Sequence, residues 1–311
     1  MKNIHAFELI QNTLRKFINP NAEVLSVENQ PIHMGLQAVD LNRHHVQFKT
    51  DGAARSLSLI SKRATSIERR VLSRLYSQKA NVPFSLSHAP DEEERSLLCI
   101  QDVDFQTDYT NLNMNALQKK EPKVLAHIHI SNYGQRKELS WLPAADGLHI
   151  EKMVNERWLP QWETAKRQEP FLEVFGEYLS SVEAVAATIS EDMKMVIHDE
   201  QSQTLIHNDL NPGNVLVQHN TDVFFIDWEE TRYGSLFLDV PLRCRTQQQI
   251  EEYREVLADA NIEISSHRFE QLYQIASRYL GLRYMSWNLG AWTSHSQAKE
   301  DLRKYLDMVV G

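Results

Sequence analysis

The sequence predicts an α+β fold, with an antiparallel sheet in the N-terminal third and a mostly helical remainder. Between residues 23 and 60 the chain consists of short alternating apolar runs, which are typical of strands with one buried face. Beyond residue 104 the apolar residues recur mainly at helical spacing. A hairpin pattern at residues 205–229 interrupts the helical part and carries polar residues at both ends.

The individual elements follow from these patterns. Residues 4–17 are predicted to form a helix, because Phe7, Ile10 and Leu14 recur at helical spacing. Asp51-Gly52 marks a turn between two strands. The strands are expected at 24–27, 38–41, 45–48, 57–60 and 96–100, and further helices at 66–75, 113–131, 171–196 and within 247–310.

Composition and charge limit the class of protein. The chain has 311 residues, enough for two subdomains, and 42% of them are apolar. No apolar run approaches the length of about 18 residues that a transmembrane helix needs, so no membrane association is expected. The net charge of −9 argues weakly against a nucleic-acid partner and is compatible with a cationic substrate.

Two further features favour a cytoplasmic protein. The N-terminal segment has neither the apolar core nor the cleavage site of a signal peptide, so we do not expect it to be one. The two cysteines, Cys99 and Cys244, fit a reducing compartment better than a disulfide framework. We therefore expect the cytoplasm as the location.

The hairpin contains two short apolar runs, at residues 214–217 and 223–226. Both runs contain branched side chains and are flanked by turn residues, and Asn220-Thr221-Asp222 between them is a turn signal. The pattern predicts two buried strands joined by a tight connection. A hairpin of this kind holds the residues at its ends rigidly.

Those end residues have the chemistry of phosphoryl transfer. His207, Asp209 and Asn214 precede the first strand, and Asp227 follows the second. Transfer from ATP needs one carboxylate to accept the proton of the acceptor hydroxyl, and an amide with a second carboxylate to hold magnesium. A metal-hydrolase site is less favoured, because no further histidine or carboxylate stands nearby at metal-ligand spacing.

The sequences HNDLNPGN at 207–214 and IDWE at 226–229 resemble the catalytic and metal motifs of the aminoglycoside phosphotransferase and choline kinase family. The resemblance implies a two-lobed, protein-kinase-like fold with an N-lobe of residues 1–103 and a C-lobe of residues 104–311. It also implies an enzyme that uses ATP (or GTP) and Mg²⁺. The acceptor would be a small hydroxylated molecule such as an aminoglycoside-like antibiotic, an amino alcohol or a sugar.

The same resemblance implies roles for single residues. Asp209 would be the catalytic base, and Asn214 and Asp227 would bind the metal. His207 and Asp239 would hold the catalytic loop in shape. Asp239 belongs to GSLFLDV at 234–240, which resembles a further signature of the family.

Lys62 and Glu68 resemble the phosphate-binding lysine and the helix glutamate that holds it in kinases of this fold. The alternative is a surface lysine and a glutamate that merely begins a helix. Lys49 is a rival lysine, but the turn after it leaves no helix glutamate in register. We therefore predict that Lys62, positioned by Glu68, binds ATP.

Two further parts of the nucleotide site have weaker signals. The strand at 96–100 leads into Gln101 and Val103, whose backbone groups the resemblance assigns to the adenine. Residues 33–37 stand where a kinase covers the ATP phosphates, but they contain a single glycine. An ordinary hairpin is the alternative for that loop.

The acceptor site is predicted from aromatic residues. Segment 132–170 carries Trp158 and Trp162, and a C-terminal helix carries Tyr284 and Trp287. An aromatic wall can hold an ammonium group. The alternative is that these side chains simply pack the helices together.

Two other functions are alternatives to a small-molecule kinase. A catalytically inactive, nucleotide-binding pseudokinase or scaffold is favoured slightly by the single-glycine loop, but it has no use for Lys62, Asp209, Asn214 and Asp227 together. A protein kinase is disfavoured, because the peptide-binding segment with its A-P-E motif is missing. The motifs are shared by kinases of antibiotics, choline-like amino alcohols, homoserine and sugars, so they select no acceptor among these.

Overall fold

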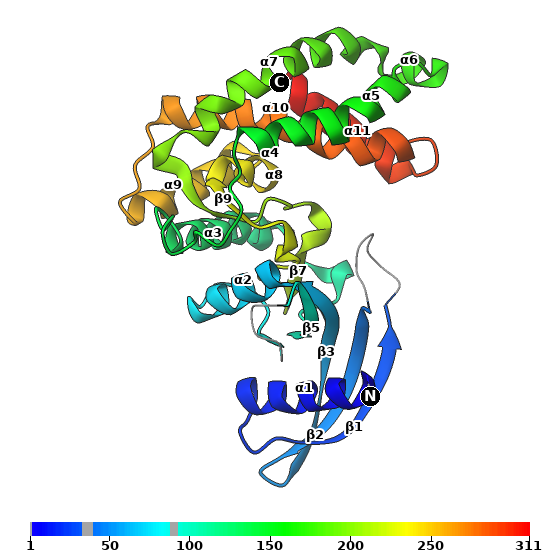
Figure 1. The fold of residues 1–311 in the computed structure, drawn as a ribbon, viewed down its shortest axis with the longest axis vertical. Helices are drawn as coiled ribbons and strands as arrows, with labels where there is room; N and C mark the ends of the chain where they lie inside the picture. The colour runs from blue at the N-terminus through cyan, green and yellow to red at the C-terminus, as the bar shows by residue number, and fades with distance from the viewer. Residues whose placement is uncertain (1, 33–39, 88–92) are drawn as a thin grey trace. The chain divides into compact units, whose positions relative to one another are not determined.

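A computed structural model describes residues 2–32, 40–87 and 93–311 of the chain (Figure 1). The chain divides into two compact units, each of which is considered by itself. The first unit comprises Met1–Val124 and Asp209–Thr231, and the second comprises Leu125–Asn208 and Arg232–Gly311. This division differs from the predicted lobes, whose boundary near residue 104 stays a prediction.

The first unit is built on a five-stranded antiparallel sheet with the order β1-β2-β3-β5-β4. Strands β1, β2 and β3 are consecutive in the sequence and antiparallel neighbours in the sheet. The alternation of apolar residues sets their pairing, and the turn at Asp51-Gly52 joins β2 to β3. The strands are β1 (Glu23–Pro31), β2 (Asn42–Thr50), β3 (Ala53–Thr65), β4 (Ser85–Ser87) and β5 (Arg95–Gln101).

Helix α1 (Lys2–Phe17) covers one face of this sheet, and Figure 1 shows it beside β1, β2 and β3. Its buried residues pack against Val46, Phe48 and Leu59 of the sheet in one apolar core. Because side chains alternate along a strand, Ile60 and Lys62 point to the opposite face. That second face carries the predicted nucleotide site.

Helix α2 (Ser66–Ser77) follows β3 without an intervening loop. The hairpin of β7 (Val215–Gln218) and β8 (Asp222–Phe225) belongs to the same unit, although it lies far along the sequence. Asn81 joins the two parts: its side-chain amide donates to the carbonyl of Val223 at 3.1 Å. The hairpin connection uses a left-handed backbone at His219 and Asn220, as a tight turn requires.

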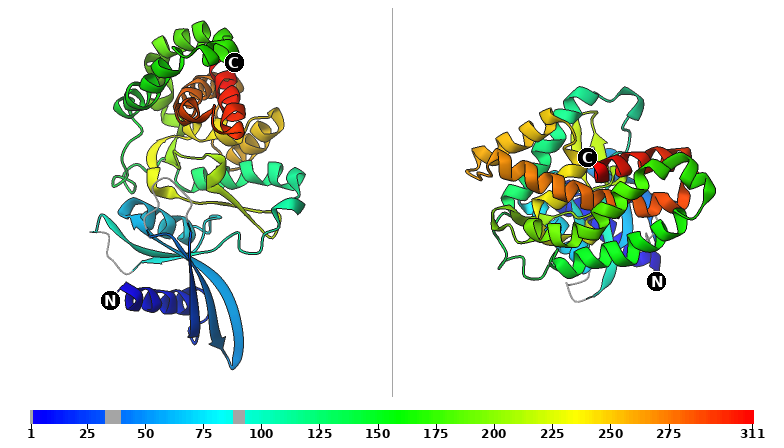
Figure 2. Two further views of the ribbon diagram at one scale, coloured as in Figure 1. Left: turned by 90° about the vertical axis from the view of Figure 1, so that its right-hand side faces the viewer. Right: turned by 90° about the horizontal axis from the view of Figure 1, so that it is seen from above.

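The second unit is mainly helical and contains one short antiparallel strand pair, β6 with β9. Figure 2 shows α10 and α11 running side by side within it. The helices are α4 (Gly147–Lys152), α5 (Leu159–Ala165), α6 (Glu169–Phe175), α7 (Leu179–Ile197), α8 (Val240–Arg243), α9 (Gln247–Asp259), α10 (Ser266–Ala291) and α11 (Ser296–Val310). Helix α3 (Met114–Ser131) begins in the first unit, and the strands are β6 (Gln203–Ile206) and β9 (Arg232–Ser235).

The helices predicted at 4–17, 66–75 and 113–131 and the strands predicted at 96–100, 214–217 and 223–226 are confirmed within two residues at each end, whereas β1, β2 and β3 extend further than the strands predicted at 24–27, 45–48 and 57–60. Two predictions were wrong. Residues 40–41, the described part of the strand predicted at 38–41, precede β2 and are not in a strand. The single helix predicted at 171–196 is two helices, α6 and α7, because a short 3₁₀ segment at Gly176–Tyr178 separates them. Glycine disfavours a continuous helix, which accounts for the break. The predicted phosphate loop at 33–37 and the first half of the strand at 38–41 lie outside the described residues.

No helix in the described part of the chain has the length and hydropathy needed to cross a membrane. The two cysteines, Cys99 and Cys244, are both buried and carry free thiols.

Candidate active site

Lys62 lies on β3, and α2 begins four residues later. Thr65 caps this helix by accepting a hydrogen bond from the backbone N–H of Glu68 at 3.3 Å. The cap turns the chain so that the Glu68 side chain returns toward the strand. Lys62 Nζ therefore lies 2.7 Å from Glu68 Oε1, and the predicted ion pair is present in the structure.

A second carboxylate meets the same ammonium group. Lys62 Nζ lies 2.8 Å from Oδ1 of Asp227, which comes two residues after the end of β8. Asp227 has a left-handed backbone, with φ 63° and ψ 61°. A non-glycine residue in this region stores strain, which is often found at functional sites.

The chain around Asp227 is anchored by its neighbour. Trp228 is fully buried, and its indole N–H donates to the carbonyl of Phe225 at 2.9 Å. Thr231 donates its hydroxyl to the Trp228 carbonyl at 2.7 Å. The Asp227 side chain keeps 45% of its surface exposed, so its oxygens are accessible to a ligand.

The electrostatics of this cluster follow from burial and charge. Burial disfavours the Lys62 ammonium, but the carboxylates of Glu68 and Asp227 outweigh this, so the pKa of Lys62 is raised. Burial also raises the pKa of Glu68, while the charge of Lys62 opposes that shift. Lys62 is thus a fixed cation at neutral pH, held between two acidic side chains.

Asp209 and Asn214 are in contact in the same unit. The side-chain amide of Asn214 donates to the Asp209 carbonyl at 2.7 Å and to its Oδ2 atom at 3.2 Å. Asn211 shapes the loop between them, since its side chain accepts from the N–H of Gly213 at 2.8 Å. The backbone N–H of Ile226 donates to the Asn214 carbonyl at 3.0 Å, which ties this loop to the segment before Asp227.

In the second unit, Asp239 holds the residues that precede Asp209. Its Oδ2 atom accepts from the backbone N–H of His207 at 2.6 Å, and its Oδ1 atom accepts from that of Asn208 at 2.8 Å. Asp239 is fully buried, and His129 Nε2 lies 3.2 Å from its Oδ2 atom. Asn208 has a left-handed backbone, with φ 64°, so two N–H groups converge on one carboxylate.

One acidic residue of the cluster had no role in the sequence prediction. Oxygens of Glu68, Asp227 and Glu229 lie within 4.8 Å of one another. Carboxylate oxygens are what Mg²⁺ prefers, so the residues present fit such an ion. Glu229 also forms an ion pair with Arg95 at the start of β5. The signal for Glu229 was its position two residues after Asp227, whereas nothing local marked Arg95.

Gln101 and Val103, the residues predicted to contact the adenine, flank a buried acid. Gln101 ends β5, and its backbone N–H donates to the carbonyl of Phe84 at 2.9 Å. Val103 is buried. The carboxylate of Asp102 between them is bound by Arg43 on β2. The adenine contacts of Gln101 and Val103 stay a prediction.

The four aromatic candidates for the acceptor site differ in exposure. Trp158 and Trp162 are 2% and 1% exposed, and their rings stack at 5.7 Å. Tyr284 stacks on Tyr305 at 5.9 Å, whereas Trp287 is 55% exposed. The buried tryptophans match the packing alternative, and acceptor binding by the four residues stays a prediction.

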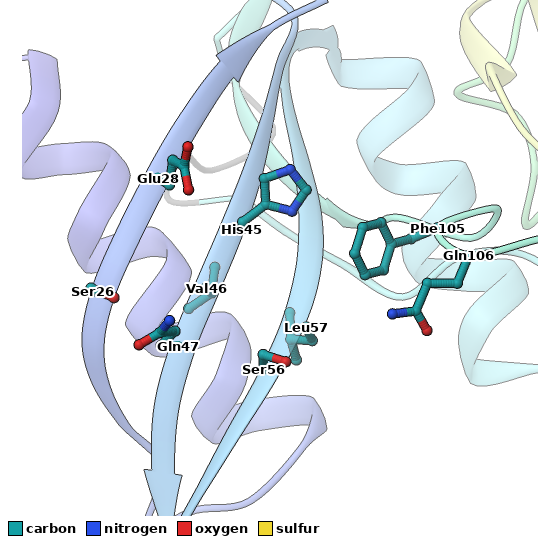
Figure 3. Close-up of a pocket in the computed structure, with 9 residues that line it drawn as sticks. All are labelled: Ser26, Glu28, His45, Val46, Gln47, Ser56, Leu57, Phe105 and Gln106. Atoms are coloured by element: carbon teal, nitrogen blue, oxygen red, sulfur yellow. The ribbon is translucent and has the colours of Figure 1, made fainter.

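A pocket of about 210 Å³ opens on the sheet face that carries Lys62 (Figure 3). Three strands and the segment after β5 form it, and Figure 3 shows the rings of His45 and Phe105 next to each other, with their centroids 5.4 Å apart. Its lining residues are Ser26, Glu28, His45, Val46, Gln47, Ser56, Leu57, Phe105 and Gln106.

Comparison with known proteins gives a family match. Residues 53–270 match the model of the phosphotransferase enzyme family, which covers the segment from β3 into α10. No curated protein sequence matches the chain.

Solved structures share the fold at low sequence identity. Spectinomycin phosphotransferase APH(9)-Ia, in complex with ADP and spectinomycin, has a TM-score of 0.58 at 12% identity, with 97% of each chain covered. An aminoglycoside phosphotransferase from Alicyclobacillus acidocaldarius has a TM-score of 0.58 at 13% identity, covering 91% of this chain and 89% of its own. Choline kinase LicA from Streptococcus pneumoniae has a TM-score of 0.50 at 15% identity, with 98% and 99% covered. The chain therefore has the protein-kinase-like fold of these phosphotransferases.

Proposed function

The chain belongs to the phosphotransferase enzyme family, and on that premise we propose that it transfers the γ-phosphoryl group of ATP to a hydroxyl group of a small molecule. The observation that carries the proposal is the position of Lys62 between Glu68 and Asp227. A lysine held by one buried carboxylate and touching a second, exposed one is suited to bind nucleotide phosphates beside a metal ion.

Each predicted residue then has a part in the reaction. Lys62 binds phosphate oxygens, and Glu68 holds the ammonium in place. Asp227 and the side-chain oxygen of Asn214 would hold Mg²⁺, with Glu229 as a further acidic side chain beside Asp227. When bound, the ion neutralises the charge of the phosphate oxygens and leaves the bond to the γ-phosphorus easier to break.

Asp209 orients and deprotonates the acceptor. Its carboxylate orients the hydroxyl group toward the γ-phosphorus and takes its proton as the new O–P bond forms and the bond to the β-phosphate oxygen breaks. Asn214 donates to Asp209 Oδ2, which restricts the carboxylate to one orientation. His207 and Asp239 hold the preceding loop, since Asp239 accepts the two N–H groups before Asp209. Positioning and charge neutralisation supply most of the catalysis in such a reaction.

Small acceptors are supported by the related structures. One was solved with ADP and spectinomycin, and another is a choline kinase. Together with the net charge of −9, this favours a cationic or polyhydroxylated acceptor, bound between segment 132–170 and the C-terminal helix that carries Tyr284 and Trp287. A cytoplasmic location is part of the same proposal.

The decisive experiment measures ATP consumption with Mg²⁺ against a panel of antibiotics, hydroxylated amines and sugars. We expect ADP and a phosphorylated acceptor in equal amounts for one class of compound, with the phosphate located by ³¹P NMR. Asp209→Asn is the matched control, because it preserves the shape of the side chain and removes its charge. Nucleotide binding without transfer to any compound, unaltered by Asp209→Asn, would instead support a scaffold.

A further inference from the structure

On the sheet face that carries Lys62, side chains of neighbouring strands lie in rows that run across the sheet. In an antiparallel sheet, directly opposed residues point to the same face, and the next row lies two residues along. Lys62 opposes Leu98 in the first row. The second row contains Gln30, Arg43, Ile60 and Ile100, and the third contains Glu28, His45 and Ser58.

The rows cover the length of a nucleotide. Two residues advance the strand by roughly 7 Å, so the second and third rows lie roughly 7 and 14 Å from the row of Lys62. That is the scale of the separation between the phosphates and the base of a bound nucleotide. If Lys62 binds phosphates, a base that extends along β3 toward its N-terminal end meets the row of Arg43.

Arg43 is held in place by Asp102, the residue between Gln101 and Val103. Its Nε atom donates to Oδ2 at 2.7 Å and its Nη2 atom donates to Oδ1 at 3.1 Å. Ser58 of the third row donates its hydroxyl to the same Oδ2 atom at 2.6 Å. One carboxylate therefore receives three hydrogen bonds and joins β2, β3 and the chain that leaves β5.

The two partners differ in exposure. The Asp102 side chain is 2% exposed, whereas the Arg43 side chain is 30% exposed. A bidentate pair fixes the plane of the guanidinium, and a fixed guanidinium with free surface is suited to stack on a flat ring. It also costs little further ordering when a ligand binds.

We propose that Arg43 and Asp102 determine nucleobase binding in this chain. The inference rests on the proposed nucleotide site. The guanidinium of Arg43 stacks on the base, and the buried carboxylate of Asp102 positions the backbone of Gln101 and Val103 beside it. The pocket of Figure 3 adjoins this position, since His45 directly opposes Ser58.

The test compares a ligand that has a base with one that lacks it. Binding of ADP and of tripolyphosphate, each with Mg²⁺, is measured by calorimetry for the full chain and its variants. Arg43→Ala should weaken ADP about tenfold, as loss of a stacked, charge-assisted contact does, and leave tripolyphosphate unchanged. Arg43→Lys keeps the charge without the planar group and should also weaken ADP. Lys62→Met should weaken both ligands.

Arg63→Ala is the matched control, because Arg63 lies on the same sheet in an exposed pair with Asp40 and should leave both affinities unchanged. Thermal unfolding checks that each variant folds. If Arg43→Ala does not fold, Ser58→Ala provides a milder change, because it removes one hydrogen bond from the same Asp102 carboxylate. Unchanged ADP affinity in Arg43→Ala, or equal weakening of both ligands, would overturn the inference. A wild-type chain that binds neither ligand, with Lys62→Met without effect, would mark failure of the proposed function itself.

Discussion

Lys62 Nζ lies 2.8 Å from Asp227 Oδ1, although 165 residues separate the two in the sequence. Both belong to the first compact unit, and Glu68 contacts the same ammonium group from the other direction. Lys62 therefore has one permanent, buried partner and one exposed partner. The exposed carboxylate of Asp227 can bind a metal ion while Lys62 stays paired with Glu68.

This relationship predicts the outcome of Asp227→Ala. Mg²⁺-dependent binding of ADP should be lost, because the exposed oxygens next to Lys62 are removed. The fold should persist, since Lys62 keeps its ion pair with Glu68. Calorimetric titration of ADP with and without Mg²⁺ measures the effect. Asp222→Ala on β8 is the control, and an unaltered Mg²⁺ dependence in Asp227→Ala would remove Asp227 from the metal site.

The contact of α10 with α11 predicts a stability effect at Gly281. A Cβ atom at this position would lie 2.7 Å from Val309 Cγ2 and 2.8 Å from the carbonyl oxygen of Tyr305. The Tyr305 carbonyl oxygen belongs to the backbone and cannot yield without moving α11, so Gly281→Ala should lower the free energy of unfolding by about 1–3 kcal/mol. Urea unfolding provides the measurement.

Gly290 on the same helix is the matched control. A Cβ atom there would meet only Gln161 Oε1, at an ordinary 3.8 Å. Gly290→Ala should raise the free energy of unfolding by about 0.5–1 kcal/mol, because alanine favours the helix. Equal effects of the two substitutions would show that helix propensity, and not the contact with α11, decides the outcome.

The sequence was most informative where the relevant residues are close together in the chain. Asp209 with Asn214, and Lys62 with Glu68, are each separated by five or six residues, and strand ends and a helix cap determine their geometry locally. The antiparallel sheet was predicted for the same reason, since alternation and turns are local signals.

Contacts that depend on strand register could not be predicted from the sequence. Arg43 and Asp102 are 59 residues apart, and only the pairing of β2, β3 and β5 brings them together. Burial likewise depends on long-range packing, so the sequence could not distinguish the buried Trp162 from the exposed Trp287. The break at Gly176 was missed because apolar spacing continues on both sides of it.

His149 in the second unit predicts a pH dependence of stability. Burial, with the nearby cations Arg232 and Arg283, lowers the pKa of His149 to about 3. The unfolded chain therefore binds a proton near pH 6.5 that the folded chain does not bind, and stability falls as the pH decreases below that value. Between pH 7 and pH 5 this residue should cost about 2 kcal/mol.

Urea unfolding at both pH values, on the wild type and on His149→Gln, isolates this contribution. The wild type should lose about 2 kcal/mol more than the variant on going from pH 7 to pH 5. Glutamine retains polar groups near Asn208, which His149 Nε2 approaches at 3.5 Å, and it does not titrate in this range. Parallel losses in the two proteins would show that His149 does not titrate differently on folding.

The substitution Asp209→Asn distinguishes an enzyme from a scaffold. The Asn214 amide donates to Asp209 Oδ2 at 3.2 Å, and an asparagine at position 209 can still offer an oxygen to it. Asp209→Asn should therefore retain the loop and lose only the charge that accepts the proton of the acceptor. We expect kcat to fall by roughly 100-fold or more, while the affinity for ADP changes little. Steady-state kinetics with the acceptor found in the panel, together with ADP calorimetry, measure both effects. Turnover of Asp209→Asn at the wild-type rate would refute the assignment of Asp209 as the base, and a parallel loss of ADP affinity would point to a role in holding the nucleotide site.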